Sequence, residues 1–96
     1  MFEEMKTFNW DEGKNQWLKR ERGVSFEQVV FCIEEGKLID VIKHPNQAKY
    51  KEQKFYVIDI DNYAFIVPYV EEEQGIFLKT IFPSRKYTRI YLYKER

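Results

Sequence analysis

The chain of 96 residues lacks several features that define large classes of proteins. Cys32 is its only cysteine, which excludes an internal disulfide and a zinc site built from several thiolates. Its four glycines form no phosphate-binding loop, and no apolar run approaches the roughly 20 residues of a membrane span. With 16 basic and 16 acidic residues it is no polybasic nucleic-acid binder, so any such contact requires a local basic patch.

Apolar and aromatic residues supply enough material for one packed core. They make up 44% and 18% of the chain, which excludes disorder as a description of the whole. No linker, repeat or low-complexity tract divides it, so we expect a single domain over residues 1–96. The first residues are acidic where an export signal would be basic, so we expect a cytoplasmic protein without a membrane contact.

Capping signals predict two short helices in the first 36 residues. Asp11 has the side chain of an N-terminal cap, and Gly23 stands where a C-terminal cap would end the first helix. Ser25 and Gln28 have the spacing of a capping box, which predicts the start of the second helix, and Gly36 predicts its end.

After the second helix the pattern changes to strands. Four runs are rich in Ile, Val, Tyr and Phe: residues 38–42, 55–60, 63–70 and 76–82. The two-residue link Asp61-Asn62 predicts an antiparallel hairpin, and residues 85–95 are expected to form a short helix. The expected fold is therefore α+β, with two N-terminal helices packed on a four-stranded, mainly antiparallel sheet and a short C-terminal helix.

The connection over residues 43–53 is longer than usual and carries the only histidine, His44. Histidine exchanges protons near neutral pH, so His44 is a candidate for acid–base catalysis; the alternative is a solvated loop residue or the cap of a strand. A metal site needs three or four ligands, and Asp40 is the one nearby side chain that could bind a metal ion together with His44. We therefore expect no metal site.

Basic residues are concentrated in residues 79–96. This segment contains six positive side chains and one acidic side chain, which gives a net charge of +5. The positive residues are Lys79, Arg85, Lys86, Arg89, Lys94 and Arg96. Arg85 and Lys86 directly follow Ser84 at a predicted junction of strand and helix, where backbone N–H groups add to their attraction for a phosphate. For Tyr87 and the tyrosines after it, two predictions are open. Their rings stack on unpaired bases, or they are buried against the sheet.

Three segments together resemble the BrnT family of bacterial toxins. Residues 8–15 read Phe-Asn-Trp-Asp-Glu-Gly-Lys-Asn and residues 22–27 read Arg-Gly-Val-Ser-Phe-Glu, similar to the family's Phe-x-Trp-Asp-x-x-Lys and His-Gly-Val-x-Phe patterns. Residues 81–86, Ile-Phe-Pro-Ser-Arg-Lys, look like the family's Ile-Ile-Ser-Ala-Arg segment. The resemblance spans most of the chain.

The resemblance implies a RelE-like toxin of a type II toxin–antitoxin system. Such a toxin is an endoribonuclease that needs no metal or cofactor and that inhibits translation and growth by cleaving RNA. It positions the ribose 2′-hydroxyl against the adjacent phosphate and stabilises the added negative charge with Arg and Lys. Its implied partners are the RNA substrate and a ribbon-helix-helix antitoxin, and it meets operator DNA only through the antitoxin complex.

Residue by residue, the resemblance implies catalytic roles for three positions. Arg85 matches the family's arginine, His44 lies in a loop where many members carry a histidine, and Lys54 stands where an arginine is common. The residues expected to bind RNA are Lys79, Lys86, Tyr87 and Arg89. The chain departs from the family pattern at three positions: Arg22 replaces a histidine, Pro83 replaces a serine, and Thr80 falls where a basic residue is expected.

Two other functions are compatible with the same residues. One is a non-catalytic module that binds a protein or nucleic acid through its aromatic and basic surface. The other is a small structural domain whose caps and core aromatics serve only folding.

Overall fold

The structure is a computed structural model that describes residues 7–93, and it confirms both predicted N-terminal helices. Helix α1 spans Glu12–Arg22, is capped by the Asp11 side chain and ends at Gly23, whose φ of 68° is left-handed. Helix α2 spans Phe26–Glu34 and begins at the Ser25 cap. Both starts are local events, because a side-chain oxygen satisfies a backbone N–H that the helix leaves free.

Within residues 7–93 the sheet has six strands instead of the four expected. They are β1 (Phe8–Asn9), β2 (Leu38–Lys43), β3 (Gln53–Ile60), β4 (Tyr63–Glu72), β5 (Gly75–Leu78) and β6 (Phe82–Pro83). The order is β1-β5-β4-β3-β2, with β6 also paired to β4, and only the β1–β5 pair is parallel. The α+β class, the β3–β4 hairpin and the mainly antiparallel pairing are confirmed, whereas the sheet has more than the four strands expected and includes one parallel pair.

Pro68 accounts for the division of the expected fourth strand into β5 and β6. The Pro68 carbonyl accepts a hydrogen bond from the Lys79 N–H at 2.8 Å, so the Pro68 backbone faces this neighbour and not β3. Proline has no N–H to continue the ladder on that side. Residues 79–81 leave the ladder there, and antiparallel pairing resumes where Phe82 lies opposite Ile66.

Strand β1 is only two residues long and pairs where Gly75 opens β5. The Ile76 N–H donates to the Thr7 carbonyl at 2.8 Å, which brings the two segments close together. A Cβ atom on Gly75 would lie 2.2 Å from the Thr7 oxygen, and Gly75 has a φ of 152°. Glycine is therefore required at this crossing.

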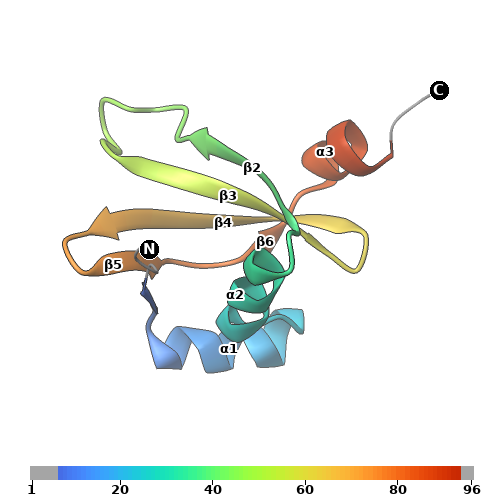
Figure 1. Ribbon diagram of the computed structural model, residues 1–96, viewed down its shortest axis with the longest axis horizontal. Coiled ribbons are helices and arrows are strands. Elements are labelled where there is room, and N and C mark those ends of the chain that lie inside the picture. Colours follow the sequence, from blue (N-terminus) through green and yellow to red (C-terminus); the bar gives the residue numbers. More distant parts are fainter. Residues whose placement is uncertain (1–6, 94–96) are drawn as a thin grey trace, which may run out of the picture.

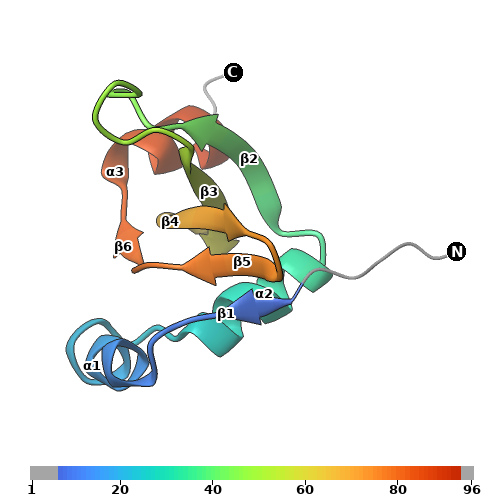
Figure 2. The same cartoon turned by 90° about the vertical axis from the view of Figure 1, so that its left-hand side faces the viewer.

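Helices cover both faces of the sheet, so the protein has three layers (Figures 1 and 2). On one face α1 and α2 pack over the side chains of Tyr56, Ile58, Ile60, Val67, Tyr69, Ile76 and Leu78. On the other face, α3 (Arg85–Tyr87) and the π-helical turn η1 (Thr88–Leu92) pack over Val57, Ala64 and Ile66. These two elements replace the helix expected over residues 85–95, of which residues 94 and 95 lie outside the described part. No helix within residues 7–93 has the length and hydropathy needed to cross a membrane.

Candidate functional site

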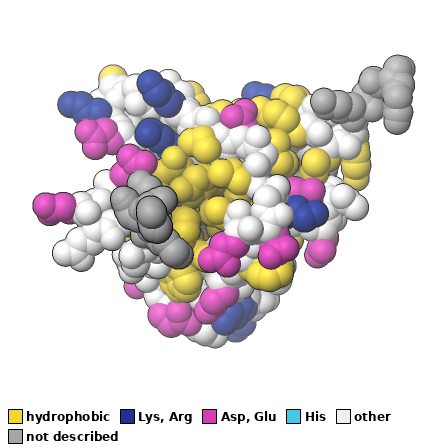
Figure 3. Space-filling view, viewed as in Figure 1, with side chains coloured by type: hydrophobic (Ala, Val, Ile, Leu, Met, Phe, Trp, Pro, Cys, Tyr) yellow, Lys and Arg dark blue, Asp and Glu magenta, His cyan; other side chains and the backbone are white. Residues whose placement is uncertain are grey.

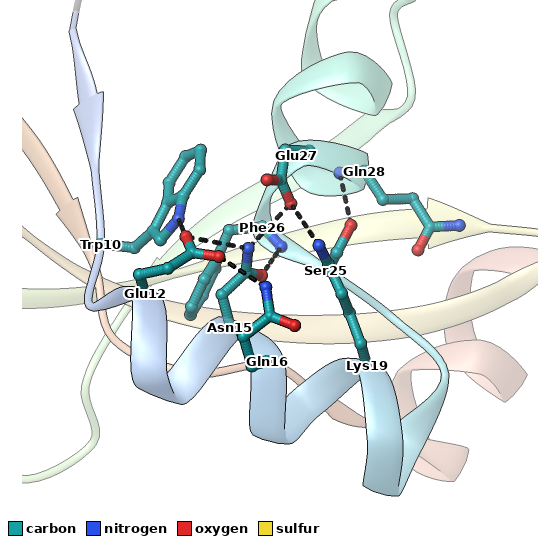
Figure 4. Close-up of polar contacts among 9 residues, drawn as sticks. All are labelled: Trp10, Glu12, Asn15, Gln16, Lys19, Ser25, Phe26, Glu27 and Gln28. Carbon is teal, nitrogen blue, oxygen red and sulfur yellow. Dashed lines mark hydrogen bonds and ion pairs between the residues drawn. The ribbon is translucent and has the colours of Figure 1, made fainter.

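The N-terminal segments that carry the family resemblance serve to join α1 to α2 (Figure 4). Asn15 is fully buried; its Oδ1 accepts from the Phe26 N–H at 2.8 Å and its Nδ2 donates to Glu27 at 2.9 Å. Trp10 stacks on Phe26 with ring centroids 5.5 Å apart and donates from Nε1 to Glu12. The hydrogen bond from Asn15 lowers the pKa of the Glu27 carboxyl. These side chains satisfy one another, which makes the motif structural.

Arg22, which stands where the BrnT pattern has a histidine, also has a structural partner. Its Nη1 donates to the Ile81 carbonyl at 2.7 Å, and its guanidinium carbon lies 5.0 Å from the centre of the Trp17 ring. Ile81 belongs to the segment between β5 and β6 that has left the ladder. Arg22 thus ties α1 to the chain just before the C-terminal basic residues.

The segment that carries Arg85 is fixed to β4 through Ala64. The Ser84 N–H donates to the Ala64 carbonyl at 2.9 Å, and the Ala64 N–H donates to Thr88 Oγ1 at 2.8 Å. Thr88 Oγ1 donates in turn to the Ser84 carbonyl at 2.7 Å, and Ser84 Oγ caps α3. Arg85 and Lys86, between these anchors, are exposed on a rigid turn. Sequence reasoning missed Thr88, although its spacing of four from Ser84 was a usable signal.

Four basic side chains near this turn have no carboxylate partner among the residues that the structure describes. Within residues 7–93, ion pairs join only Lys19 to Glu27 and Lys54 to Glu71, so Lys79, Arg85, Lys86 and Arg89 are free of them. The Lys79 N–H donates to the Pro68 carbonyl and the Ser84 N–H donates to the Ala64 carbonyl. Pro68 and Ala64 are four residues apart in β4, so Lys79 and the Arg85 turn are anchored about 13 Å apart along this strand. Arg85, Lys86 and Arg89 therefore form the compact part of this basic cluster.

Tyr87 and Tyr91 pack inward beneath that cluster. Their rings stack at 5.9 Å between centroids and lie against the buried residues of β3 and β4. The Tyr91 hydroxyl donates to Asp40 at 2.5 Å, which lowers the pKa of the Asp40 carboxyl and raises that of Tyr91. Of the two alternatives for the tyrosines, these two rings are partly buried against the sheet, while Tyr93 is 60% exposed.

His44 organises the β2–β3 loop. Its Nδ1 accepts a hydrogen bond from the Asn46 N–H at 3.0 Å, and its ring stacks on Tyr50 at a centroid distance of 4.2 Å. The ring also lies 5.2 Å from that of Phe55, on the sheet face that α3 and η1 cover.

The structure does not bring His44, Lys54 and Arg85 together. Lys54 stands two residues before Tyr56 in β3 and so lies on the same face of the sheet, which α1 and α2 cover, and its Nζ lies 3.9 Å from Glu71 Oε1. The His44 N–H donates to the carbonyl of Gln53, at the start of β3. The Arg85 turn is instead bonded to Ala64, which pairs with Asp59 near the other end of β3. From residue 53 to residue 59 the distance along β3 is about 20 Å. Catalytic roles for His44 and Lys54 stay predictions from the sequence.

A cleft of about 440 Å³ lies elsewhere, between the end of α2 and the β3–β4 turn. Its lining includes Phe31, Cys32 and the carboxylates of Glu35, Asp59 and Asp61. Burial raises the pKa of the Cys32 thiol, and the carboxylates would repel a phosphate. No group of three or more His, Cys, Asp or Glu side chains within residues 7–93 is arranged to hold a metal ion.

Comparison of the chain with models of known protein families, with curated proteins and with solved structures gives no match. The functional assignment therefore has to rest on the residues and their geometry.

Proposed function

We propose that this chain is the toxin of a type II toxin–antitoxin pair and that it acts on RNA as a metal-independent endoribonuclease. The observation that carries the proposal is the cluster of Arg85, Lys86 and Arg89, three exposed cations without carboxylate partners in the described part of the chain. Hydrogen bonds to β4 hold the backbone of this turn, so less backbone freedom is lost when a phosphate binds.

Arg85 is the residue assigned to phosphate binding in this proposal. A guanidinium can bind two phosphate oxygens at once and keeps its charge at any physiological pH, which suits it to the extra negative charge of a cleavage transition state. Lys86 adds a second charge next to it. The resemblance of residues 81–86 to the BrnT segment supports the same assignment.

The proposed setting is the cytoplasm, with a ribbon-helix-helix antitoxin as the partner that neutralises the toxin and links it to operator DNA. The proposal does not rest on His44 or Lys54, since neither belongs to the cluster that contains Arg85.

Incubation of the purified chain with a single-stranded oligoribonucleotide and with its 2′-deoxy counterpart tests the proposal. RNA cleavage with intact DNA is expected, because the attacking group is the 2′-hydroxyl. Arg85→Ala should lower the rate roughly 100-fold or more, as loss of one transition-state contact does. Arg20→Ala, which removes an exposed arginine from α1, is the matched control and should cleave normally. Cleavage by Arg85→Ala at the native rate would refute the assignment.

A non-catalytic RNA-binding module is the second candidate, and the separation of His44, Lys54 and Arg85 favours it. It predicts that the native chain retains RNA without cutting it and that Arg85→Ala weakens retention. The same assay, read for bound and for cleaved RNA, distinguishes the two functions.

A further inference from the structure

The β2–β3 loop carries a second basic surface that the sequence analysis did not identify. Residues 43–53 contain three lysines and one glutamate, a net charge of +2 in a chain that sums to zero. Lys43, Lys49 and Lys51 are exposed and have no ion-pair partner in the described part of the chain. Lys and Arg side chains gather over this loop in the space-filling view (Figure 3).

An exposed aromatic ring lies among these lysines. Tyr50 is 38% exposed, and its ring stacks on the ring of His44. The Nζ atom of Lys49 lies over the Tyr50 ring, 5.4 Å from its centre, so this long side chain has to swing aside when a base stacks there. Aromatic rings beside positive charges form the usual surface for unpaired nucleotides, because bases stack on the ring while the charges attract the backbone.

Hydrogen bonds within the loop hold Tyr50 in place. Its N–H donates to the Asn46 carbonyl at 2.9 Å, and its own carbonyl accepts from the Gln53 N–H at 3.1 Å. Gln47 donates from Nε2 to the His44 carbonyl at 2.8 Å. The ring is thus positioned before any ligand arrives, which reduces the entropy lost on binding.

This loop and the Arg85 turn lie on the same side of the sheet. In two perpendicular views both stand on the side opposite α1 and α2 (Figures 1 and 2). They are separated along the sheet by about 20 Å, a span that several nucleotides of a single strand can bridge. One strand of RNA can therefore contact both surfaces.

We infer that the β2–β3 loop is a second contact for single-stranded RNA, in which an unpaired base stacks on Tyr50 while Lys49 and Lys51 bind the flanking phosphates. The inference rests on the proposed function and extends it by specifying unpaired RNA as the ligand. It gives His44 a positioning role, that of the ring supporting Tyr50.

Fluorescence anisotropy of a short labelled oligouridine with methylated 2′-hydroxyls, which the proposed activity cannot cleave, tests this inference with the full chain. Tyr50→Leu should weaken binding roughly tenfold, whereas Tyr50→Phe, which keeps the ring, should bind normally. Lys49→Ala with Lys51→Ala should reduce the salt dependence of log Kd by about 1.4, or 0.7 per charge. Lys37→Ala, at the opposite end of β2, is the control for loss of one exposed lysine. Circular dichroism establishes that each variant is folded.

Three results would overturn the inference, and they differ in what they say of the proposed function. If the loop variants bind with native affinity and Arg85→Ala binds more weakly, the loop is not a contact for RNA, and the proposed function stays intact. Equal affinity for duplex RNA would exclude stacking on an unpaired base. A native chain that binds no RNA would refute both proposals.

Discussion

The side-chain oxygen of Asn15, the fourth residue of α1, accepts a hydrogen bond from the backbone N–H of Phe26, the first residue of α2, at 2.8 Å. This bond is buried, and it satisfies an N–H that the helix itself leaves free. Asn15→Ala would leave that N–H without a partner in the core. We expect a loss of about 1 to 3 kcal/mol in the free energy of unfolding, measured by urea denaturation.

Gln16→Ala is the control for this prediction. Gln16 donates to Glu12 at 2.6 Å on the exposed side of the same helix, and pairs of this kind contribute only about 0.2 to 0.5 kcal/mol. Equal losses in the two variants would show that the buried bond has no special part in joining the helices.

A second prediction concerns the attachment of α3 to β4. Thr88→Val keeps the shape of the side chain but leaves the Ala64 N–H without its acceptor, so a cost of about 1 to 3 kcal/mol in unfolding free energy is expected. Thr88→Ser keeps the hydroxyl and should cost less. If Thr88→Ser were the more destabilising variant, the methyl group and not the hydrogen bond would hold the turn.

The contact between Asp40 and Tyr91 predicts a dependence of stability on pH. The hydrogen bond from Tyr91 lowers the pKa of Asp40 in the folded chain, so its stabilising contribution is present above the unfolded value of about 3.9. That contribution is lost as the pH falls through the lower folded value. The difference in thermal midpoint between the native chain and Asp40→Asn should therefore shrink as acid is added. A difference that stays constant from neutral to acidic pH would contradict this account.

Local signals made much of the fold predictable. The caps at Asp11 and Ser25 and the turn at Asp61 depend on neighbouring residues, and their elements are where the sequence places them. Strand β1 depends on pairing with a segment almost 70 residues away, which no local pattern encodes. The consequence of Pro68 for β5 and β6 likewise follows only once the neighbour of β4 is known.

The candidate site was less predictable, because it depends on tertiary distances. The basic cluster around Arg85 was visible in the sequence, since its members are adjacent. The distance between Arg85 and His44 depends on which end of β3 each residue lies near, and that is set by the pairing of the strands. The role proposed for Tyr50 depends on its stacking on His44, six residues earlier across a loop, and no periodic pattern indicates such a contact.

Inducible expression in a bacterial host tests the central claim most directly. The native chain, Arg85→Ala and the control Arg20→Ala are compared for growth and for the integrity of total RNA, with expression levels matched. The account predicts growth arrest with RNA cleavage for the native chain and for Arg20→Ala, and relief of both effects by Arg85→Ala. Unimpaired growth with intact RNA, from a folded and abundant native chain, would contradict it.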